Sequence, residues 1–118
     1  MFYTYMIRTE KGTLYTGIAK DLFRRMREHT EQKEKSAKYT RCRKVVSLAA
    51  LWSSRDRSTA SRLEYRIKTL TKKEKEALLA SPALLFSYFP ELEKEDYIFH
   101  PKANLDLFLN RITLAQLP

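Results

Sequence analysis

The chain has 118 residues, of which 43% are hydrophobic and 12% aromatic, a composition that suits one folded domain and excludes an intrinsically disordered protein. Its 23 Lys and Arg against 14 Asp and Glu give a net charge of +9 at pH 7, which indicates a polyanionic partner. A single cysteine, Cys42, excludes an internal disulfide and a multi-cysteine metal site, and we expect it to be a buried, inert thiol.

Two strands joined by a tight turn are predicted at the start of the chain. Residues 2–8 and 13–18 are rich in aromatic and β-branched side chains, which fit the pleated surface of a sheet. Between them, Glu10 to Gly12 predict a hairpin loop built on a type I turn, because Gly12 accepts the positive φ that ends such a loop.

The length of this loop decides which residues of the two strands face each other. It pairs Tyr5 with Gly17 and Tyr15 with Ile7, so both tyrosines point to the same side of the ribbon and converge on one ligand. Gly17 then leaves a gap opposite Tyr5 where a backbone or a phosphate can approach. A loop one residue longer would place the tyrosines on opposite faces. The structural alternative is that both are half-buried strand aromatics.

A basic amphipathic helix is predicted at residues 21–30. Asp21 is its expected N-cap, and Arg25 and His29 share a face because they are four residues apart. Each has a structural alternative, Arg25 as a solvated cation and His29 as a charge that suits the helix C-terminus. The other predicted elements are a third strand at 44–52 and helices at 58–70 and 72–80.

The charged segment from Thr30 to Lys44 has two interpretations. It contains almost no aliphatic residues, so it is either a solvated loop or a contact with nucleic acid, and the sequence favours neither. An aromatic ring among cations suits a phosphate backbone with a base or sugar stacked on the ring. The second interpretation therefore assigns nucleic-acid binding to Lys38, Tyr39, Arg41 and Arg43.

A carboxylate, Glu64, stands at the edge of the apolar stripe of the helix at 58–70. Spacing alone favours a structural role for it. Ser61 and Glu64 match a capping box, and Glu64 and Lys68 form a favourable pair four residues apart.

The end of the chain differs in character from its start. We place a domain at residues 1–80 and a C-terminal extension, aromatic-rich and mildly acidic, at residues 81–118. Asn104 is a candidate cap for a last helix, whose apolar side must pack on the domain or on a partner. Of the 23 cations, 20 precede residue 81, so the basic surface belongs to the domain.

Four short motifs in the first 30 residues together resemble the opening of a GIY-YIG nuclease domain. They are Tyr3-Thr4-Tyr5, Tyr15-Thr16-Gly17, Arg25 and His29. The resemblance covers roughly residues 2–80, within the usual size range of a domain, and is closest to the short bacterial members of the family. It implies a fold of the α/β (α+β) type, with a three-stranded antiparallel sheet flanked by helices.

The resemblance also implies a metal-dependent active site. In this family the helix after the third strand carries a glutamate that binds a divalent metal, and Glu64 stands in the matching place, so Mg²⁺ or Mn²⁺ is the expected cofactor. Arg25 then donates to the phosphate, and His29 holds a phosphate oxygen or relays a proton. We take Tyr5 as the general base, with a pKa lowered by neighbouring cations, and Tyr15 as the residue that orients water or phosphate.

The favoured function is a metal-dependent endonuclease of low sequence specificity. DNA is favoured over RNA as the expected substrate, with branched or damaged DNA among the candidates, although the residues themselves do not distinguish DNA from RNA. The alternative is a non-catalytic nucleic-acid-binding protein that keeps the fold, and a protein-interaction module built on the aromatic extension is a third class. The sequence has no apolar run of 18 residues and no signal peptide, so we expect a cytoplasmic protein with no membrane partner.

Overall fold

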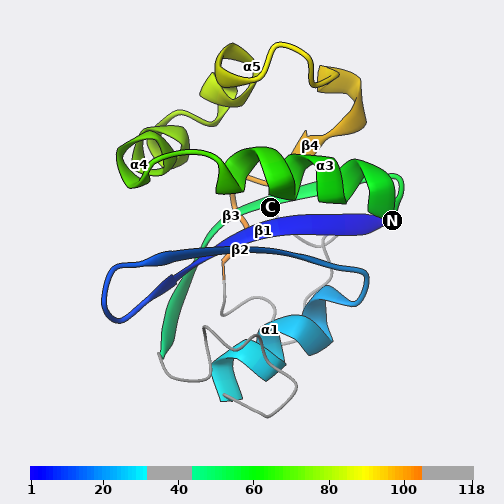
Figure 1. Cartoon of the computed structure of the whole chain (residues 1–118). Coiled ribbons are helices and arrows are strands. Elements are labelled where there is room, and N and C mark those ends of the chain that lie inside the picture. Colours follow the sequence, from blue (N-terminus) through cyan, green and yellow to red (C-terminus); the bar gives the residue numbers. More distant parts are fainter. Residues whose placement is uncertain (32–43, 105–118) are drawn as a thin grey trace.

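A computed structural model describes residues 1–31 and 44–104, whose arrangement is shown in Figure 1. The predicted strands and helices up to residue 80 are all present, with ends within two residues of those expected. In chain order the elements are β1 (Phe2–Thr9), β2 (Leu14–Ala19), α1 (Leu22–Glu31), β3 (Val45–Ser54), α3 (Arg57–Lys68), α4 (Lys72–Ala80), a 3₁₀ turn (Pro82–Leu84), α5 (Leu85–Tyr88), a second 3₁₀ turn (Lys94–Asp96) and β4 (Ile98–Phe99).

The sheet is antiparallel throughout, and its strands lie in the order β2-β1-β3-β4. The prediction of three strands is therefore wrong by one strand. β4 comes from the C-terminal extension and pairs with the end of β3, Trp52 lying opposite Phe99 and Ser53 opposite Ile98. A two-residue strand is too short to show an alternating pattern, which is why the sequence did not predict it.

The predicted register of the hairpin is confirmed. Tyr5 lies opposite Gly17 and Tyr15 opposite Ile7. At the turn, Gly12 has a φ of 80°, a conformation that glycine adopts without strain. Both tyrosines consequently lie on the face of the sheet that α1 covers.

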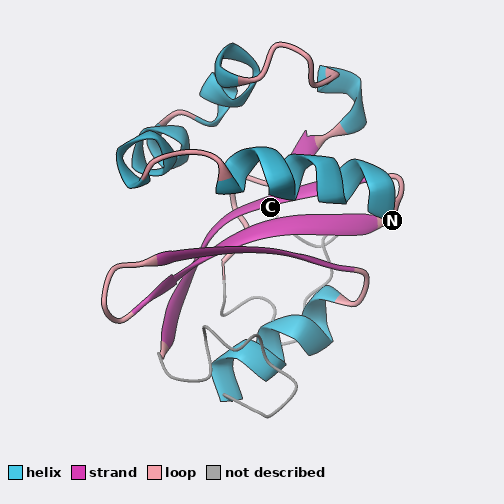
Figure 2. Ribbon diagram, viewed as in Figure 1, coloured by secondary structure: helices cyan, strands magenta, loops and turns pink. Residues whose placement is uncertain are grey.

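Helices cover both faces of the sheet, as Figure 2 shows. α1 lies on one face, where Leu22 and Met26 pack with Tyr5. α3 lies on the other face, where Leu63 packs with Met6. Successive side chains of a strand point to opposite faces, so β1 contributes Tyr5 to one core and Met6 to the other.

The described part of the C-terminal extension packs on the α3 face. Leu85, Leu92 and Tyr97 are buried in the same cluster as the apolar stripe of α3, and the Tyr97 hydroxyl donates to the Thr59 carbonyl at 2.9 Å. The division into a domain and an extension stays a prediction, and the helix predicted after Asn104 lies outside the described residues. Within residues 1–31 and 44–104, no helix combines the length and the apolar character needed to cross a membrane.

Side-chain caps fix where two of the helices begin. The Asp21 carboxylate accepts from the backbone N–H of Arg24 at 3.1 Å, so the predicted N-cap of α1 is confirmed. α3 begins after Asp56, whose carboxylate accepts from the backbone N–H of Thr59 at 2.8 Å. The capping-box interpretation of Ser61 is therefore wrong, because Ser61 lies inside the helix.

Candidate active site

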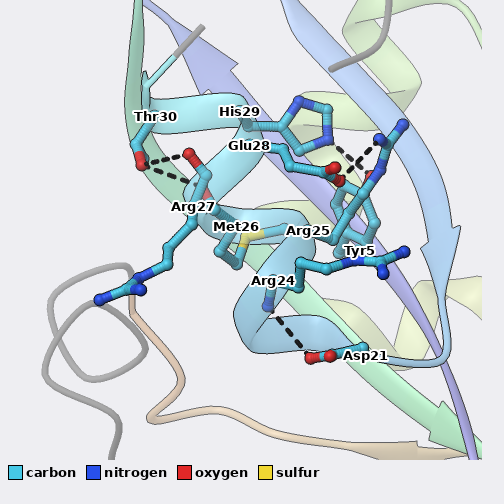
Figure 3. A network of polar contacts seen from close by, with 9 residues as sticks. All are labelled: Tyr5, Asp21, Arg24, Arg25, Met26, Arg27, Glu28, His29 and Thr30. Carbon is cyan, nitrogen blue, oxygen red and sulfur yellow. Dashed lines mark hydrogen bonds and ion pairs between the residues drawn. The ribbon is translucent and has the colours of Figure 1, made fainter. Parts of the chain in front are cut away.

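Three side chains from β1 and α1 meet at one hydroxyl group. The Tyr5 hydroxyl oxygen lies 2.7 Å from Nε2 of His29, and it accepts a hydrogen bond from Nε of Arg25 at 3.3 Å (Figure 3). The Tyr5 hydroxyl therefore joins the imidazole of His29 to the guanidinium of Arg25. Tyr5 and His29 are both fully buried.

Gly17 allows the Tyr5 phenol to occupy this position. A Cβ atom on Gly17 would lie 2.5 Å from the Tyr5 hydroxyl oxygen and 2.8 Å from its Cζ, closer than real Cβ contacts. The phenol therefore lies against the bare backbone of β2. The interpretation of this gap as room for a backbone or a phosphate is wrong on this face, because Tyr5 fills it. Binding of nucleic acid at Gly17 stays a prediction.

Tyr15 completes a cluster of three rings. Its ring centroid lies 6.4 Å from that of Tyr5 and 5.4 Å from that of His29, and the last two centroids are 5.6 Å apart. Tyr15 keeps partial exposure, whereas the other two rings are buried. The convergence of the two phenols that the hairpin predicts is confirmed, with Tyr15 nearer to solvent.

A second charged group of α1 lies beside the cluster. Glu28 accepts from Nη1 of Arg25 at 3.4 Å, and its side chain is only 10% exposed. Tyr5 and Glu28 thus hold the Arg25 guanidinium at two different nitrogens. Glu28 was missed in the sequence, although its position three residues after Arg25 and next to His29 was a usable signal.

Burial controls the protonation of the cluster. It raises the pKa of Tyr5 above the ordinary value by more than the neighbouring Arg25 lowers it. Burial, together with the Arg25 charge, lowers the pKa of His29 to about 4. Both groups are therefore neutral at pH 7. The expectation that cations lower the pKa of Tyr5 is wrong, because desolvation of the phenolate outweighs the attraction of one guanidinium.

Glu64 is carried by α3, the helix on the opposite face of the sheet from α1, and this helix contacts both β1 and β2. The Glu64 charge contributes to the raised pKa of Tyr5, so the two groups interact electrostatically. The Glu64 side chain is 22% exposed, and Oε2 lies 3.2 Å from Nζ of Lys68, which confirms the predicted ion pair. In the described ranges, no group of three or more His, Cys, Asp or Glu side chains is placed to hold a metal ion. Metal binding by Glu64 stays a prediction.

Four predicted nucleic-acid contacts lie outside the described residues, as does the thiol of the chain. The four contacts are Lys38, Tyr39, Arg41 and Arg43, and the thiol is that of Cys42. The described site therefore unites four of the predicted residues, Tyr5, Tyr15, Arg25 and His29, and the fifth, Glu64, interacts electrostatically with Tyr5.

The fold and this cluster together define a class of protein. Residues 1–77 match the model of the GIY-YIG catalytic domain, a span that contains the hairpin, α1, β3 and α3. The chain belongs to the GIY-YIG family, whose nucleases act on nucleic acids.

Several short bacterial proteins are similar to most of the chain. The UPF0213 protein FN1575 of Fusobacterium nucleatum subsp. nucleatum is 43% identical over 81 residues, which are 69% of this chain and 79% of that protein. The UPF0213 protein YhbQ of Salmonella typhimurium is 46% identical over 99 residues, which are 80% of this chain and 97% of that protein. The solution NMR structure of the UPF0213 protein BH0048 from Bacillus halodurans is 31% identical and covers 75% of this chain and 97% of its own, with a TM-score of 0.43. The resemblance to short bacterial members of the family is thereby confirmed.

Proposed function

We propose that the protein is a metal-dependent endonuclease that hydrolyses phosphodiester bonds in DNA with low sequence specificity. The observation that carries this proposal is the Tyr5 hydroxyl held between Arg25 and His29, beside Tyr15, in a GIY-YIG domain. Hydrolysis needs donors for the phosphate, a group that handles the proton of the attacking water, and charge that stabilises the leaving oxygen. The cluster supplies the phosphate donors and the group that handles the proton. Glu64 is the candidate ligand of a cation that would supply the stabilising charge.

Burial divides the roles of the two phenols in this proposal. Tyr15 and Arg25 keep exposed surface, so they are the groups that contact the scissile phosphate and the attacking water. Tyr5 lies behind them, and its raised pKa makes it a poor proton acceptor at pH 7. In this proposal Tyr15, and not Tyr5, is the general base. Tyr5 and His29 then position the Arg25 guanidinium and the Tyr15 ring.

Glu64 fits a divalent cation of the magnesium type. One partly exposed carboxylate suits Mg²⁺ or Mn²⁺, since such an ion keeps several waters and takes further oxygens from the substrate. The same single ligand does not suit a closed zinc site, which needs four. A cation held by Glu64 would supply positive charge against the charge that develops on the phosphate and the leaving oxygen. The Lys68 ammonium competes for the same carboxylate.

Low sequence specificity follows from the kind of contact that this site offers. Arg25 and the surrounding cations recognise phosphate groups, which position a strand but carry no information about its bases. Because this attraction is electrostatic, we expect the affinity for nucleic acid to fall steeply as salt rises.

Incubation of the purified protein with nicked, branched and single-stranded DNA and with RNA, with and without Mg²⁺ or Mn²⁺, tests the proposal. We expect cleavage of DNA that requires the metal, shows no preference for base sequence and is lost in Tyr15→Phe. Binding to these substrates without cleavage of any of them would contradict the enzyme and support a non-catalytic nucleic-acid-binding protein.

A further inference from the structure

A surface pocket adjoins the Arg25 side of the cluster. It has a volume of about 440 Å³ and is lined by residues 18–21, at the end of β2, and by Arg24, Arg25 and Glu28 of α1. Arg25 also donates to the Tyr5 hydroxyl, so a group bound in the pocket lies next to the proposed reaction centre. Figure 3 shows Arg24 and Arg25 extending from α1 toward one side, whereas Arg27 extends in the opposite direction.

Two cations of this pocket, Lys20 and Arg24, form no salt bridge with a described acid, and the charged lining residues (Lys20, Arg24 and Arg25 against Asp21 and Glu28) leave a net charge of +1. The side chains of Lys20 and Arg24 are exposed. The two acids of the pocket wall are both engaged with neighbours. Asp21 caps α1 through the backbone N–H of Arg24, and Glu28 accepts from Arg25. Lys20 and Arg24 therefore give the pocket its affinity for an anion.

We propose that Lys20 and Arg24 bind, in this pocket, the phosphate that neighbours the scissile phosphate in a nucleic-acid strand. The inference rests on the proposed function, which places the scissile phosphate at Arg25 and Tyr15. Arg25 joins the two positions, since its guanidinium contacts Tyr5 on one side and Glu28, in the pocket wall, on the other. A strand that runs from the cluster into the pocket thus meets Arg25, Arg24 and Lys20.

This placement defines the substrate class more closely. The site holds two consecutive phosphates of one strand, so a strand with at least two phosphodiesters binds better than a ligand with one. The contacts set the register of the strand without reading its bases, because both cations bind phosphate oxygens. Lys20 and Arg24 are thus substrate-binding residues outside the catalytic cluster.

Inorganic phosphate provides a first test that does not depend on cleavage. Backbone amide NMR of the full chain, titrated with phosphate and without divalent metal, should show saturable shifts at residues 18–21. Lys20→Ala should weaken this binding by about fivefold, the effect of losing one charge-assisted contact. Lys73→Ala is the matched control, because it removes one exposed positive charge from α4, outside the pocket wall, and it should leave the binding unchanged. Equal loss in both variants, or no saturable shift at these amides, would overturn the proposal.

Two short DNA ligands then test whether the pocket serves a nucleic-acid strand. The probes are the thymidine dinucleotide TpT, with one phosphate, and the trinucleotide TpTpT, with two. In the wild type and in Lys73→Ala, TpTpT should bind about fivefold more tightly than TpT, and in Lys20→Ala the two should bind alike. If the ratio of the affinities for TpTpT and TpT is the same in all three proteins, the second phosphate site is wrong, while the proposed nuclease activity is not contradicted. Saturable phosphate binding with no binding of either oligonucleotide would instead contradict the proposed function and the nucleic-acid assignment of the pocket together.

Discussion

The Tyr5 hydroxyl and the His29 imidazole form a hydrogen bond of 2.7 Å in the buried interface between β1 and α1. It links the centre of the sheet to the helix that carries Arg25. Because burial raises the pKa of Tyr5 and lowers that of His29 to about 4, the two partners meet as neutral groups at pH 7. We propose that this pair positions the reaction centre and that the more exposed Tyr15 faces the substrate.

Replacing each phenol of the cluster separately tests this division of roles. Tyr15→Phe should lower the cleavage rate by at least about 100-fold, the usual contribution of a general base, and should change the dependence of the rate on pH. Tyr5→Phe should lower the rate without changing that pH dependence, and should cost about 1 kcal/mol of stability because the hydrogen bond between Tyr5 and His29 is lost. Tyr3→Phe, on the same strand, is the control and should change neither the cleavage rate nor its dependence on pH. A new pH profile in Tyr5→Phe and an unchanged one in Tyr15→Phe would return the base role to Tyr5.

The two glycines of the chain should respond differently to alanine. Gly17→Ala places a Cβ where the Tyr5 phenol lies, so we expect Tyr5 to be displaced and cleavage to fall sharply. Gly12→Ala forces alanine to a φ of 80° at the hairpin turn, and should cost about 1 kcal/mol of stability while cleavage persists. Cleavage rates and thermal unfolding of both variants check this pair. Full activity in Gly17→Ala would show that the position of Tyr5 does not matter.

The buried His29 should make stability depend on pH. The unfolded chain protonates this histidine near pH 6.5 and the folded chain only near pH 4, so the free energy of unfolding falls as pH falls through this window. Above pH 6.5 the residue is neutral in both states and has no effect, and the full loss at pH 4 is about 3 kcal/mol. Urea unfolding of the wild type and of His29→Gln between pH 4 and 7.5 measures the difference. Parallel curves for the two proteins would contradict the lowered pKa.

Glu28 should act on the reaction through Arg25. Glu28→Gln removes the charge that holds Nη1 of the guanidinium, so we expect a fall in the cleavage rate of about tenfold, equivalent to 1.4 kcal/mol. Because the residue acts by positioning, Glu28→Asp should restore part of the rate. Glu91→Gln is the control, since it removes a carboxylate that pairs with Arg66 and lies away from the cluster. A tenfold loss in the control as well would show that the effect is a general change of charge.

The hairpin explains why so much of the site was predictable from sequence. One short loop ending in Gly12 sets the register, and the register places Tyr5 and Tyr15 on one face. The spacing of four between Arg25 and His29 then puts both on one side of α1. These are local rules, and each connects residues that are close in sequence.

Burial and distant contacts were not predictable in the same way. The pKa of Tyr5 depends on a balance between desolvation by burial, which raises it, and the Arg25 charge, which lowers it. A local sequence pattern does not show how deeply α1 buries the phenol, so the outcome could not be predicted. β4 pairs with β3 across a long separation in sequence, and its two residues carry no recognisable pattern. The true cap of α3, Asp56, lay in a polar segment that offered several candidates.

Glu64 decides between an enzyme and a binding protein, and its ion pair with Lys68 provides a matched control. Glu64→Gln and Lys68→Gln break the same exposed pair, which should cost each variant no more than about 0.5 kcal/mol of stability. Only Glu64→Gln also removes the charge that would hold the divalent cation.

The most direct test is therefore the rate of Mg²⁺-dependent DNA cleavage by these two variants, with their binding of DNA measured alongside. We predict that Glu64→Gln binds DNA but does not cleave it, and that Lys68→Gln retains cleavage. Undiminished cleavage by Glu64→Gln would remove Glu64 from the site and contradict the metal-dependent mechanism.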